Sequence, residues 1–254
     1  MTKLINTSKL PNLVYEGIKA VSGQYDVDTT DIDTISTTTL IGDPLQRILT
    51  ARYGKNIEID SAKNWYSVQG TAYHTVIESV VANNPEYITE QRITTEIDGK
   101  KITGKPDIFH IPTQKLIDLK TSKAGSFCYN PNGKPEYILQ QNIYKYLIEK
   151  SWGIKVNAVR LLYMFPDFDK RKIKPGGKYP VKPALEIPVE IMTNEEIEKY
   201  IKERIAIHKK ADNLEEEKIP RCEDLWNGLR CKEYCSVSTV CPYHIKEMSD
   251  EKKK

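Results

Sequence analysis

The sequence predicts an α/β fold in which a central mixed sheet is flanked by helices. Alternating side chains in residues 102–111 and 115–119 predict a β-hairpin, and residues 137–147 have the periodicity of an amphipathic helix. The chain has 254 residues, of which 39% are hydrophobic and 29% charged. This composition excludes a disordered chain and a membrane protein, and the length allows one substantial core with a small appendage.

The predicted hairpin carries two acids and a lysine. If residues 112–113 form its turn, Asp107 lies opposite Asp118, because paired positions in a hairpin sum to a constant. Side chains alternate along a strand, so Asp118 and Lys120 share a face. Two buried carboxylates repel each other strongly, and a cation between them would remove that repulsion. A solvated face with a surface ion pair is the alternative interpretation.

A helix is predicted to open at residues 70–78, upstream of the hairpin. His74 and Glu78 are four residues apart and project from one face of this helix. Its apolar stripe is predicted to contain Tyr73, Val76, Ile77, Val80 and Val81. A lone histidine on such a helix is more often a half-buried structural residue than a metal ligand.

Downstream of the hairpin, Gln140 and Tyr144 are also four residues apart in the helix predicted for residues 137–147. They therefore share a face. Packing in the core is the ordinary role of a tyrosine at such a spacing. Gln141 is the alternative glutamine, but only two residues separate it from Tyr144.

In this order, the motifs resemble the RecB-type exonuclease branch of the PD-(D/E)xK nuclease superfamily. The short motif would be Pro106-Asp107 followed by Asp118-Leu119-Lys120, with Gln140 and Tyr144 as the QxxxY motif. The resemblance covers about residues 36–245. It implies a restriction-endonuclease-like core and a metal-dependent DNA exonuclease of recombination, repair or phage DNA processing.

The resemblance also implies roles for individual residues. Mg²⁺ or Mn²⁺ would be held by His74, Asp107, Asp118 and the backbone carbonyl of Leu119. Lys120 would position or deprotonate the attacking water. Gln140 and Tyr144 would order Lys120 or contact the DNA backbone. Glu78 is a candidate only for contacting a metal ligand.

Four of the five cysteines lie near the C-terminus, with the spacing C-x8-C-x3-C-x5-C. In a chain expected to be cytosolic, such thiols indicate a metal site rather than disulfides. The cysteine-rich tails of AddB and of CRISPR-adaptation nucleases are similar and hold an iron–sulfur cluster. This sequence departs from those tails in two ways. Its middle gap is x3 instead of x2, and Asp43-Pro44 stands in place of an upstream Cys-Pro. The four thiols are Cys222, Cys231, Cys235 and Cys241.

Zn²⁺ and [4Fe-4S] both remain open as the structural group. The local position of all four thiols slightly favours Zn²⁺, with His244 as a spare ligand. Four reduced thiols buried in a core are the third possibility. Cys128 stands apart from this set and is interpreted as structural.

Four segments are predicted along the chain. Residues 1–35 are polar with little periodicity, 36–215 form the nuclease domain, 216–245 are the cysteine-rich metal-binding segment and 246–254 a flexible tail. Within the nuclease domain, strands are predicted at residues 90–97, 156–165 and 185–192, and a helix at 194–210 with Thr193 as its cap.

A basic loop is predicted between the last two of these strands. Residues 169–182 carry six positive side chains against one negative, and the candidates for contacting DNA phosphates are Lys170, Arg171, Lys172 and Lys174. A solvated hairpin loop explains the same charges equally well. The net charge of the chain, +3, is too small to demonstrate a nucleic-acid partner.

The expected location is the cytoplasm, because no apolar run approaches the ~20 residues of a spanning helix and the N-terminal residues lack a signal-peptide core. The expected partners are DNA and a recombinase, helicase or single-strand-binding protein, with no membrane. A catalytically silent DNA-binding module and a zinc-stapled assembly protein remain alternatives to the enzyme.

Overall fold

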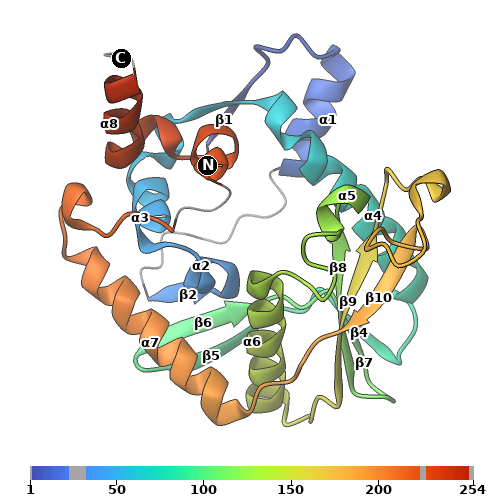
Figure 1. The fold of residues 1–254 in the computed structure, drawn as a ribbon. Helices are drawn as coiled ribbons and strands as arrows, with labels where there is room; N and C mark the ends of the chain where they lie inside the picture. The colour runs from blue at the N-terminus through green and yellow to red at the C-terminus, as the bar shows by residue number, and fades with distance from the viewer. Residues whose placement is uncertain (1, 23–32, 224–226, 252–254) are drawn as a thin grey trace. The chain divides into compact units, whose positions relative to one another are not determined.

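The computed structural model of the protein describes residues 2–22, 33–223 and 227–251. Two compact units are formed, and Figure 1 shows their elements. The first comprises Met1–Ile32, Thr38–Val68 and Glu203–Lys254, and the second Asp33–Thr37 and Gln69–Lys202. The main elements are β1 (Lys3–Ile5), α1 (Asn12–Ser22), β2 (Thr34–Ser36), α2 (Thr37–Ile41), α3 (Pro44–Tyr53), β3 (Glu58–Asp60), α4 (Trp65–Val81), β4 (Tyr87–Thr89), β5 (Ile93–Ile97), β6 (Lys100–Gly104), β7 (Ile108–His110), β8 (Lys115–Thr121), α5 (Ala124–Phe127), α6 (Pro135–Trp152), β9 (Ala158–Met164), β10 (Ala184–Pro188), α7 (Asn194–Asp212) and α8 (Pro242–Glu251).

A five-stranded mixed sheet is the centre of the second unit. Its order is β10-β9-β8-β7-β4, and only the β8–β9 pair is parallel. Parallel neighbours need a crossover connection, which here contains α5 and α6. β8 is an inner strand of this sheet, and its residues Leu116, Asp118 and Leu119 are buried. The predicted mixed sheet flanked by helices is confirmed.

The hairpin has the predicted register but one of its arms is interrupted. Ile108 pairs with Ile117 and His110 with Lys115, which places Asp107 next to Asp118. The arm expected at 102–111 is not one strand, because the backbone leaves β6 at Gly104 and re-enters a strand only at Ile108. The residues between these strands include Pro106, which lacks the N–H that a ladder bond needs.

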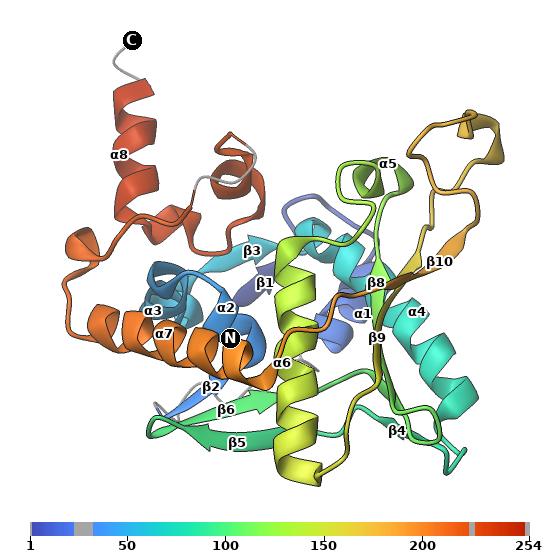
Figure 2. The same ribbon diagram turned by 60° about the horizontal axis from the view of Figure 1, so that its bottom comes forward.

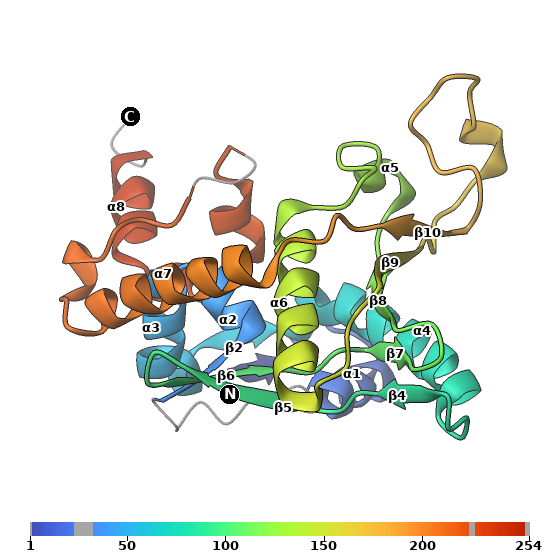
Figure 3. The ribbon, with the colours of Figure 1, turned by 90° about the horizontal axis from the view of Figure 1, so that it is seen from below.

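A second sheet in this unit has the order β2-β6-β5. Helix α6 contacts β5 and β6 of this sheet as well as β8 and β9 of the larger one, and Figures 2 and 3 show it lying across both. Residues Gln141–Ile148 of α6 are all buried. The helix therefore connects the two sheets and carries its central residues into the core, which confirms the helix predicted at 137–147.

Helix α4 differs from its predicted amphipathic pattern. It begins at Trp65, several residues before the expected start, and contains no fully buried residue. Ile77 and Val81 pack against a cluster formed by Ile108, Leu119 and Met164 of the sheet. The other members of the predicted stripe are solvent-exposed, namely Tyr73, Val76 and Val80. A narrow contact on the sheet thus replaces the wide buried face that the sequence indicated.

Three further elements agree in type with the prediction but have different ends. The strand predicted from residue 90 begins at Ile93, and the strands predicted at 156–165 and 185–192 are β9 and β10, which pair antiparallel. Helix α7 begins with a capping box, in which Thr193 Oγ1 accepts from Glu196 N and Glu196 Oε2 accepts from Thr193 N. The cap predicted at Thr193 is confirmed.

The first unit is built around a core that includes the cysteine segment. Strands β1 and β3 pair in parallel, and α3 contributes Leu45, Ile48 and Leu49 to an apolar cluster with Ile219 and Val237. Helix α8 follows the cysteines and continues to Glu251, so the segment expected as a flexible tail is helical as far as that residue. Residues 252–254 lie outside the described part of the chain.

The N-terminal residues contain more structure than their weak periodicity indicated. Within the part of 1–35 that the structure describes, β1, α1 and the start of β2 are formed, while residues 23–32 lie outside it. Throughout the described residues, the helices are too short or too polar to cross a membrane.

Candidate active site

Two buried carboxylates meet at the hairpin. Asp107 precedes β7, and its Oδ2 accepts a hydrogen bond from the backbone N of Leu119 at 2.7 Å. Asp118, on β8, is 1% exposed. Its Oδ2 forms an ion pair with Lys120 Nζ at 2.6 Å. A buried carboxylate that faces one ammonium keeps further lone pairs with which to bind a cation.

Lys120 connects the acids to helix α6. Its Nζ donates to Gln140 Oε1 at 3.2 Å, and Gln140 Nε2 donates to Tyr144 Oη at 3.0 Å. The ammonium also lies 4.6 Å from the centre of the Tyr137 ring. Burial acts to lower the pKa of Lys120, but the charges of Asp118 and Asp107 outweigh it and raise the pKa. The lysine is therefore a fixed cation at neutral pH.

Burial and the neighbouring charge of Asp118 raise the pKa of Asp107, while the charge of Lys120 acts to lower it. A bound divalent cation would favour the charged carboxylate and oppose the rise. Tyr144 experiences the same surroundings, and burial followed by the charge of Asp118 raises its pKa to about 12. The phenol is accordingly a neutral hydrogen-bonding group, able to orient Gln140 but unsuited to accepting a proton.

His74 projects from α4 toward the same place. Its Nε2 lies 3.1 Å from the carbonyl oxygen of Leu119, a contact in which the nitrogen must carry the proton and donate. Its Nδ1 lies 3.8 Å from Glu78 Oε1 and 4.0 Å from Asp107 Oδ2. Burial lowers the pKa of His74. The ring is thus a neutral imidazole whose free Nδ1 faces carboxylates, which is the state required of a metal ligand.

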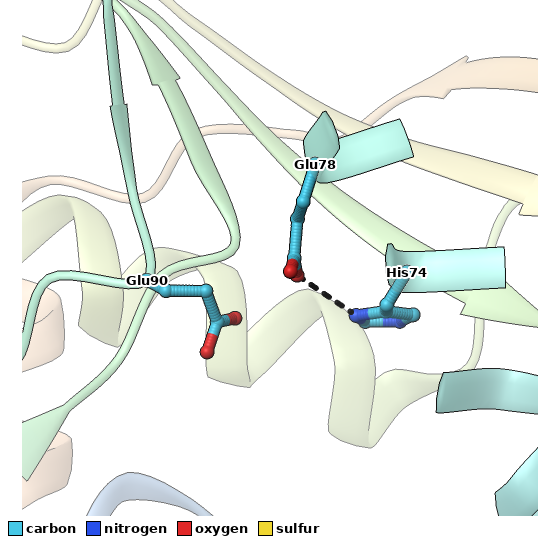
Figure 4. Close-up of side chains that lie close together, drawn as sticks. All are labelled: His74, Glu78 and Glu90. Atoms are coloured by element: carbon cyan, nitrogen blue, oxygen red, sulfur yellow. Dashed lines mark ion pairs between the residues drawn. The ribbon is translucent and has the colours of Figure 1, made fainter. Parts of the chain in front are cut away.

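Glu90 completes a group of possible metal ligands that the sequence did not reveal. Ligand atoms of His74, Glu78 and Glu90 all lie within 4.8 Å of one another, the one such set among the residues that the structure describes. Figure 4 shows His74 and Glu78 on successive turns of α4, with the Glu90 carboxylate facing them. The site therefore offers a histidine nitrogen and several carboxylates, the ligand types that Mg²⁺ and Mn²⁺ accept.

The sequence contains a signal for Glu90 that depends on knowing the strand order. Strand β4 pairs with β7 so that Thr89 lies opposite Ile108, and the next pair in this register is Glu90 with Asp107. The backbone N of Glu90 indeed donates to the Asp107 carbonyl at 3.1 Å. Glu90 is predicted to start a strand, whereas it precedes β5 and has a positive φ of 53°. Its side chain forms an ion pair with Lys105.

The basic loop between β9 and β10 extends from the sheet in Figure 3. Its four candidate DNA-binding residues are all exposed. Arg171 forms a two-pronged ion pair with Asp169 at 2.9 Å, so its guanidinium is already partly neutralised. The loop is not brought into contact with the acids by any described hydrogen bond or ion pair.

The four C-terminal thiols belong to the other unit and line one small cavity of about 20 Å³. Within the described residues, no three of their sulfur atoms lie within 4.8 Å of one another. Burial raises the pKa of Cys222 to about 12 and also raises the pKa of Cys235. Cys128 lies apart, where its thiol donates to the Ala124 carbonyl. The structure thus gathers the predicted cysteines without the close spacing of a formed metal site.

Comparison with known proteins identifies the family. The model of the PD-(D/E)XK nuclease superfamily matches residues 71–242, a range that contains His74, both acids, Lys120 and Gln140. The chain belongs to the PD-(D/E)XK nuclease superfamily. The predicted family is thereby confirmed, and with it the fold class.

The fold is shared with a solved structure. The crystal structure of SSO0001 is similar with a TM-score of 0.56 at 17% identity, covering 91% of this chain and 95% of that one. Two exonuclease structures are less similar. A phage-related exonuclease from Haemophilus somnus 129PT has a TM-score of 0.44 at 15% identity, with 70% and 92% covered. The alkaline exonuclease LHK-Exo from Laribacter hongkongensis has a TM-score of 0.45 at 13% identity, with 78% and 94% covered. A search of curated protein sequences found no match.

Proposed function

We propose that this PD-(D/E)XK protein is a deoxyribonuclease that hydrolyses phosphodiester bonds with the help of Mg²⁺ or Mn²⁺. The observation that carries the proposal is the convergence of Asp107, Asp118 and Lys120 with His74 at the end of the β7–β8 hairpin. Burying two acids and a histidine beside a single lysine remains costly, and a bound divalent cation would offset that cost. An assembly role would not require this arrangement.

The residues present fit a divalent cation. His74 Nδ1 and the carboxylates of Glu78, Glu90 and Asp107 are the candidates that the geometry supports, and Asp118 adds a buried carboxylate that is paired with Lys120. A bound Mg²⁺ or Mn²⁺ would neutralise charge that develops on the phosphate and acidify water. The Leu119 carbonyl, which lies 3.1 Å from His74 Nε2, would be a further ligand.

The chain's own groups position the reactants. Lys120 is held by Asp118 and Gln140, so its ammonium has a fixed direction from which to bind the attacking water or a phosphate oxygen. Because its pKa is raised, we propose that Lys120 acts by its charge and hydrogen bonds rather than as a base. Tyr144 fixes the amide of Gln140 and acts through it.

The finer assignment is a RecB-like exonuclease acting on DNA ends, in repair, recombination or phage DNA processing. It is supported by the order of His74, the acid pair, Lys120 and the Gln140–Tyr144 pair along the chain. In this proposal, Lys170, Lys172 and Lys174 contact phosphates and Arg171 joins them by leaving Asp169. A recombinase, helicase or single-strand-binding protein would deliver the DNA.

The four cysteines are proposed to hold a separate structural group, Zn²⁺ or [4Fe-4S]. Thiolates prefer these soft ions to Mg²⁺. The thiols belong to a different compact unit from the acids, so the proposed structural and catalytic metals are distinct.

The test is digestion of end-labelled linear and closed circular DNA, single- and double-stranded, with Mg²⁺, Mn²⁺ or EDTA. We expect degradation of linear DNA only with metal. Asp118→Asn removes a ligand charge with little change of shape and should lower the rate by roughly 100-fold or more. Lys120→Ala should do likewise while DNA binding survives, because one lysine among many phosphate contacts matters little.

Glu96→Gln is the matched control for Asp118→Asn, since it removes one carboxylate charge from an exposed position on β5. It should cleave like the wild type. Wild-type cleavage by Asp118→Asn would exclude the proposed site, and DNA binding without cleavage in the wild type would favour a silent module.

A further inference from the structure

His244 has a buried nitrogen with no partner, and it borders the cysteine cavity. Its Nδ1 is inaccessible to solvent and makes no hydrogen bond. The cavity of about 20 Å³ that it lines is also lined by all four C-terminal thiols. A buried unpaired imidazole nitrogen is costly, whereas a metal ion would satisfy it.

The backbone holds three of these thiols and His244 in one continuous segment. Cys231 lies on a short helical turn, Arg230–Tyr234, that is closed by a bond from Cys235 N to Arg230 O at 2.8 Å. Cys241 N donates to Ser238 O at 3.2 Å, and the Cys241 carbonyl accepts from Ile245 N at 3.0 Å. Cys241 thus lies immediately before α8, and His244 follows within the first turn of that helix. The resulting spacing is C-x3-C-x5-C-x2-H.

Cys222 is differently placed. It precedes residues 224–226, which lie outside the described part of the chain, and is not connected to the 231–244 segment by any described backbone hydrogen bond. It packs against the apolar cluster of Leu45 and Ile219, as Cys235 and Cys241 also do. Its separation from the 231–244 segment, and not its packing, sets it apart, and a tetrahedral ion that takes the three thiols of that segment and His244 has no position left for it.

We infer that Cys231, Cys235, Cys241 and His244, the last through Nδ1, form a Zn²⁺ site, and that Cys222 is not one of its ligands. This rests on the proposed structural metal and selects both its ligands and its identity. Three thiolates and one neutral imidazole are a common structural zinc set, whereas a [4Fe-4S] cluster is typically held by four thiolates.

Charge around the site agrees with this assignment. Zn²⁺ with three thiolates carries one net negative charge. Arg230 is near enough to Cys222 and Cys235 for their charges to interact, and it is also paired with Asp43 at 2.8 Å and bonded to Gln46. One guanidinium beside a site of one negative charge limits the cost of its burial.

Metal binding must draw the ligands together, because no three of these atoms lie within 4.8 Å of one another among the described residues. Val237 of this segment belongs to the apolar cluster, so the adjustment has to come from the short turns on either side of it. Binding should therefore order residues 231–244, because the free energy of metal binding also stabilises the local fold.

The test uses the full-length protein purified without oxygen. Zinc, iron and sulfide are measured in the wild type, His244→Ala, Cys222→Ser and Cys235→Ser, and Co²⁺ affinity is measured by titration. We expect about one zinc in the wild type and in Cys222→Ser. Co²⁺ affinity should fall roughly 100-fold or more in both His244→Ala and Cys235→Ser, because each loses one of four ligands.

If a variant fails to fold, a measurement on the wild type alone still tests the ligand set. The ¹¹³Cd NMR shift of the Cd²⁺-loaded protein distinguishes three sulfurs plus nitrogen from four sulfurs, and we expect the former. A four-sulfur shift, or loss of metal in Cys222→Ser with full affinity in His244→Ala, would overturn the ligand set. Iron with sulfide would overturn the zinc identity. No metal in any preparation would remove the structural metal itself and leave the nuclease proposal standing.

Discussion

Lys120 shows how single residues set the chemistry of this site. One side of its ammonium faces Asp118, another faces Gln140, and the Tyr137 ring lies 4.6 Å away. Such contacts remove the rotational freedom of a long side chain before substrate arrives. Preorganised charge of this kind acts on the transition state without paying for rearrangement during the reaction.

His74 and Tyr144 should respond differently to added metal. His74→Ala removes a proposed ligand, so activity should fall and partly return at high Mn²⁺. Tyr144→Phe removes only the hydroxyl that orients Gln140, so the rate should fall roughly 3- to 10-fold, the worth of one hydrogen bond, and metal should not restore it. Metal titrations of activity make the comparison. Superimposable curves for the two variants would contradict the distinct roles.

Gly104 permits the close approach of α6 to β6. A Cβ at this position would lie 2.7 Å from two atoms of the Tyr144 ring and 2.9 Å from Leu147 Cδ1. Gly104→Ala should therefore cost about 1–3 kcal/mol of stability, the usual range for overpacking, and lower activity by displacing Tyr144. Chemical denaturation and initial cleavage rates check this. Gly125→Ala is the control, because a Cβ there meets no atom within 4 Å and should change neither quantity appreciably.

At the scale of elements, the hairpin and its neighbours explain which parts of the site could be predicted. Asp107, Asp118 and Lys120 were predictable because a hairpin register follows from a local turn. Glu90 was not, because its position depends on β4 pairing with β7 across the intervening β5 and β6. The solvent exposure of Val76 and Val80 could not be predicted either, because periodicity shows that a helix face is apolar but not whether another element covers it.

Helix α7 is tied to the C-terminal end of α2 by buried polar groups of the first unit. His208 Nε2 lies 3.1 Å from the Leu40 carbonyl, and Nδ1 accepts from Arg47 Nε at 3.1 Å, which fixes the neutral tautomer that is protonated on Nε2. Arg204 donates to the carbonyls of Leu40 and Ile41, which are end groups of α2 without helical partners. A charged His208 could not keep its bond to Arg47.

Stability should consequently depend on pH through His208. Burial lowers its pKa from 6.5 to about 4, so between these values the unfolded chain binds more protons than the folded one. The contribution of His208 is fully present above pH 6.5 and is lost as the pH falls toward 4, at up to about 1.4 kcal/mol per pH unit. Denaturant unfolding from pH 7 to 4.5 measures this slope in the wild type and in His208→Gln.

The glutamine introduced by His208→Gln can donate to the Leu40 carbonyl and accept from Arg47, but it does not titrate. The difference in unfolding free energy between the two proteins isolates His208 from the carboxylates, which titrate in both. Parallel pH curves would show that His208 is protonated equally in the folded and unfolded states.

At the scale of the whole molecule, the proposed catalytic site and the proposed structural metal site belong to different compact units. The acids, Lys120 and helix α6 belong to the second unit, and the four C-terminal cysteines and His244 to the first. The sequence predicted a cysteine segment added to a nuclease domain, but not that the first unit would also recruit N-terminal residues such as Leu45. Contacts between segments far apart in sequence cannot be derived from local pattern, because each apolar residue has many compatible partners.

Because the cysteines and the acids belong to different units, removing the structural metal should lower thermal stability before it lowers activity. Cys235→Ser should lower the midpoint of thermal unfolding by several degrees, because Cys235 packs in the Leu45 cluster and its metal contributes folding free energy. Cleavage with Mg²⁺, measured well below that midpoint, should stay close to the wild-type rate, since no acid, Lys120 or His74 is altered. Thermal melts and rates on the same preparations make the comparison, with Cys128→Ser as the control for loss of a thiol outside the segment. A Cys235→Ser protein that melts with the wild type would leave these cysteines as core thiols. One that melts normally but cannot cleave would assign Cys235 to the chemistry.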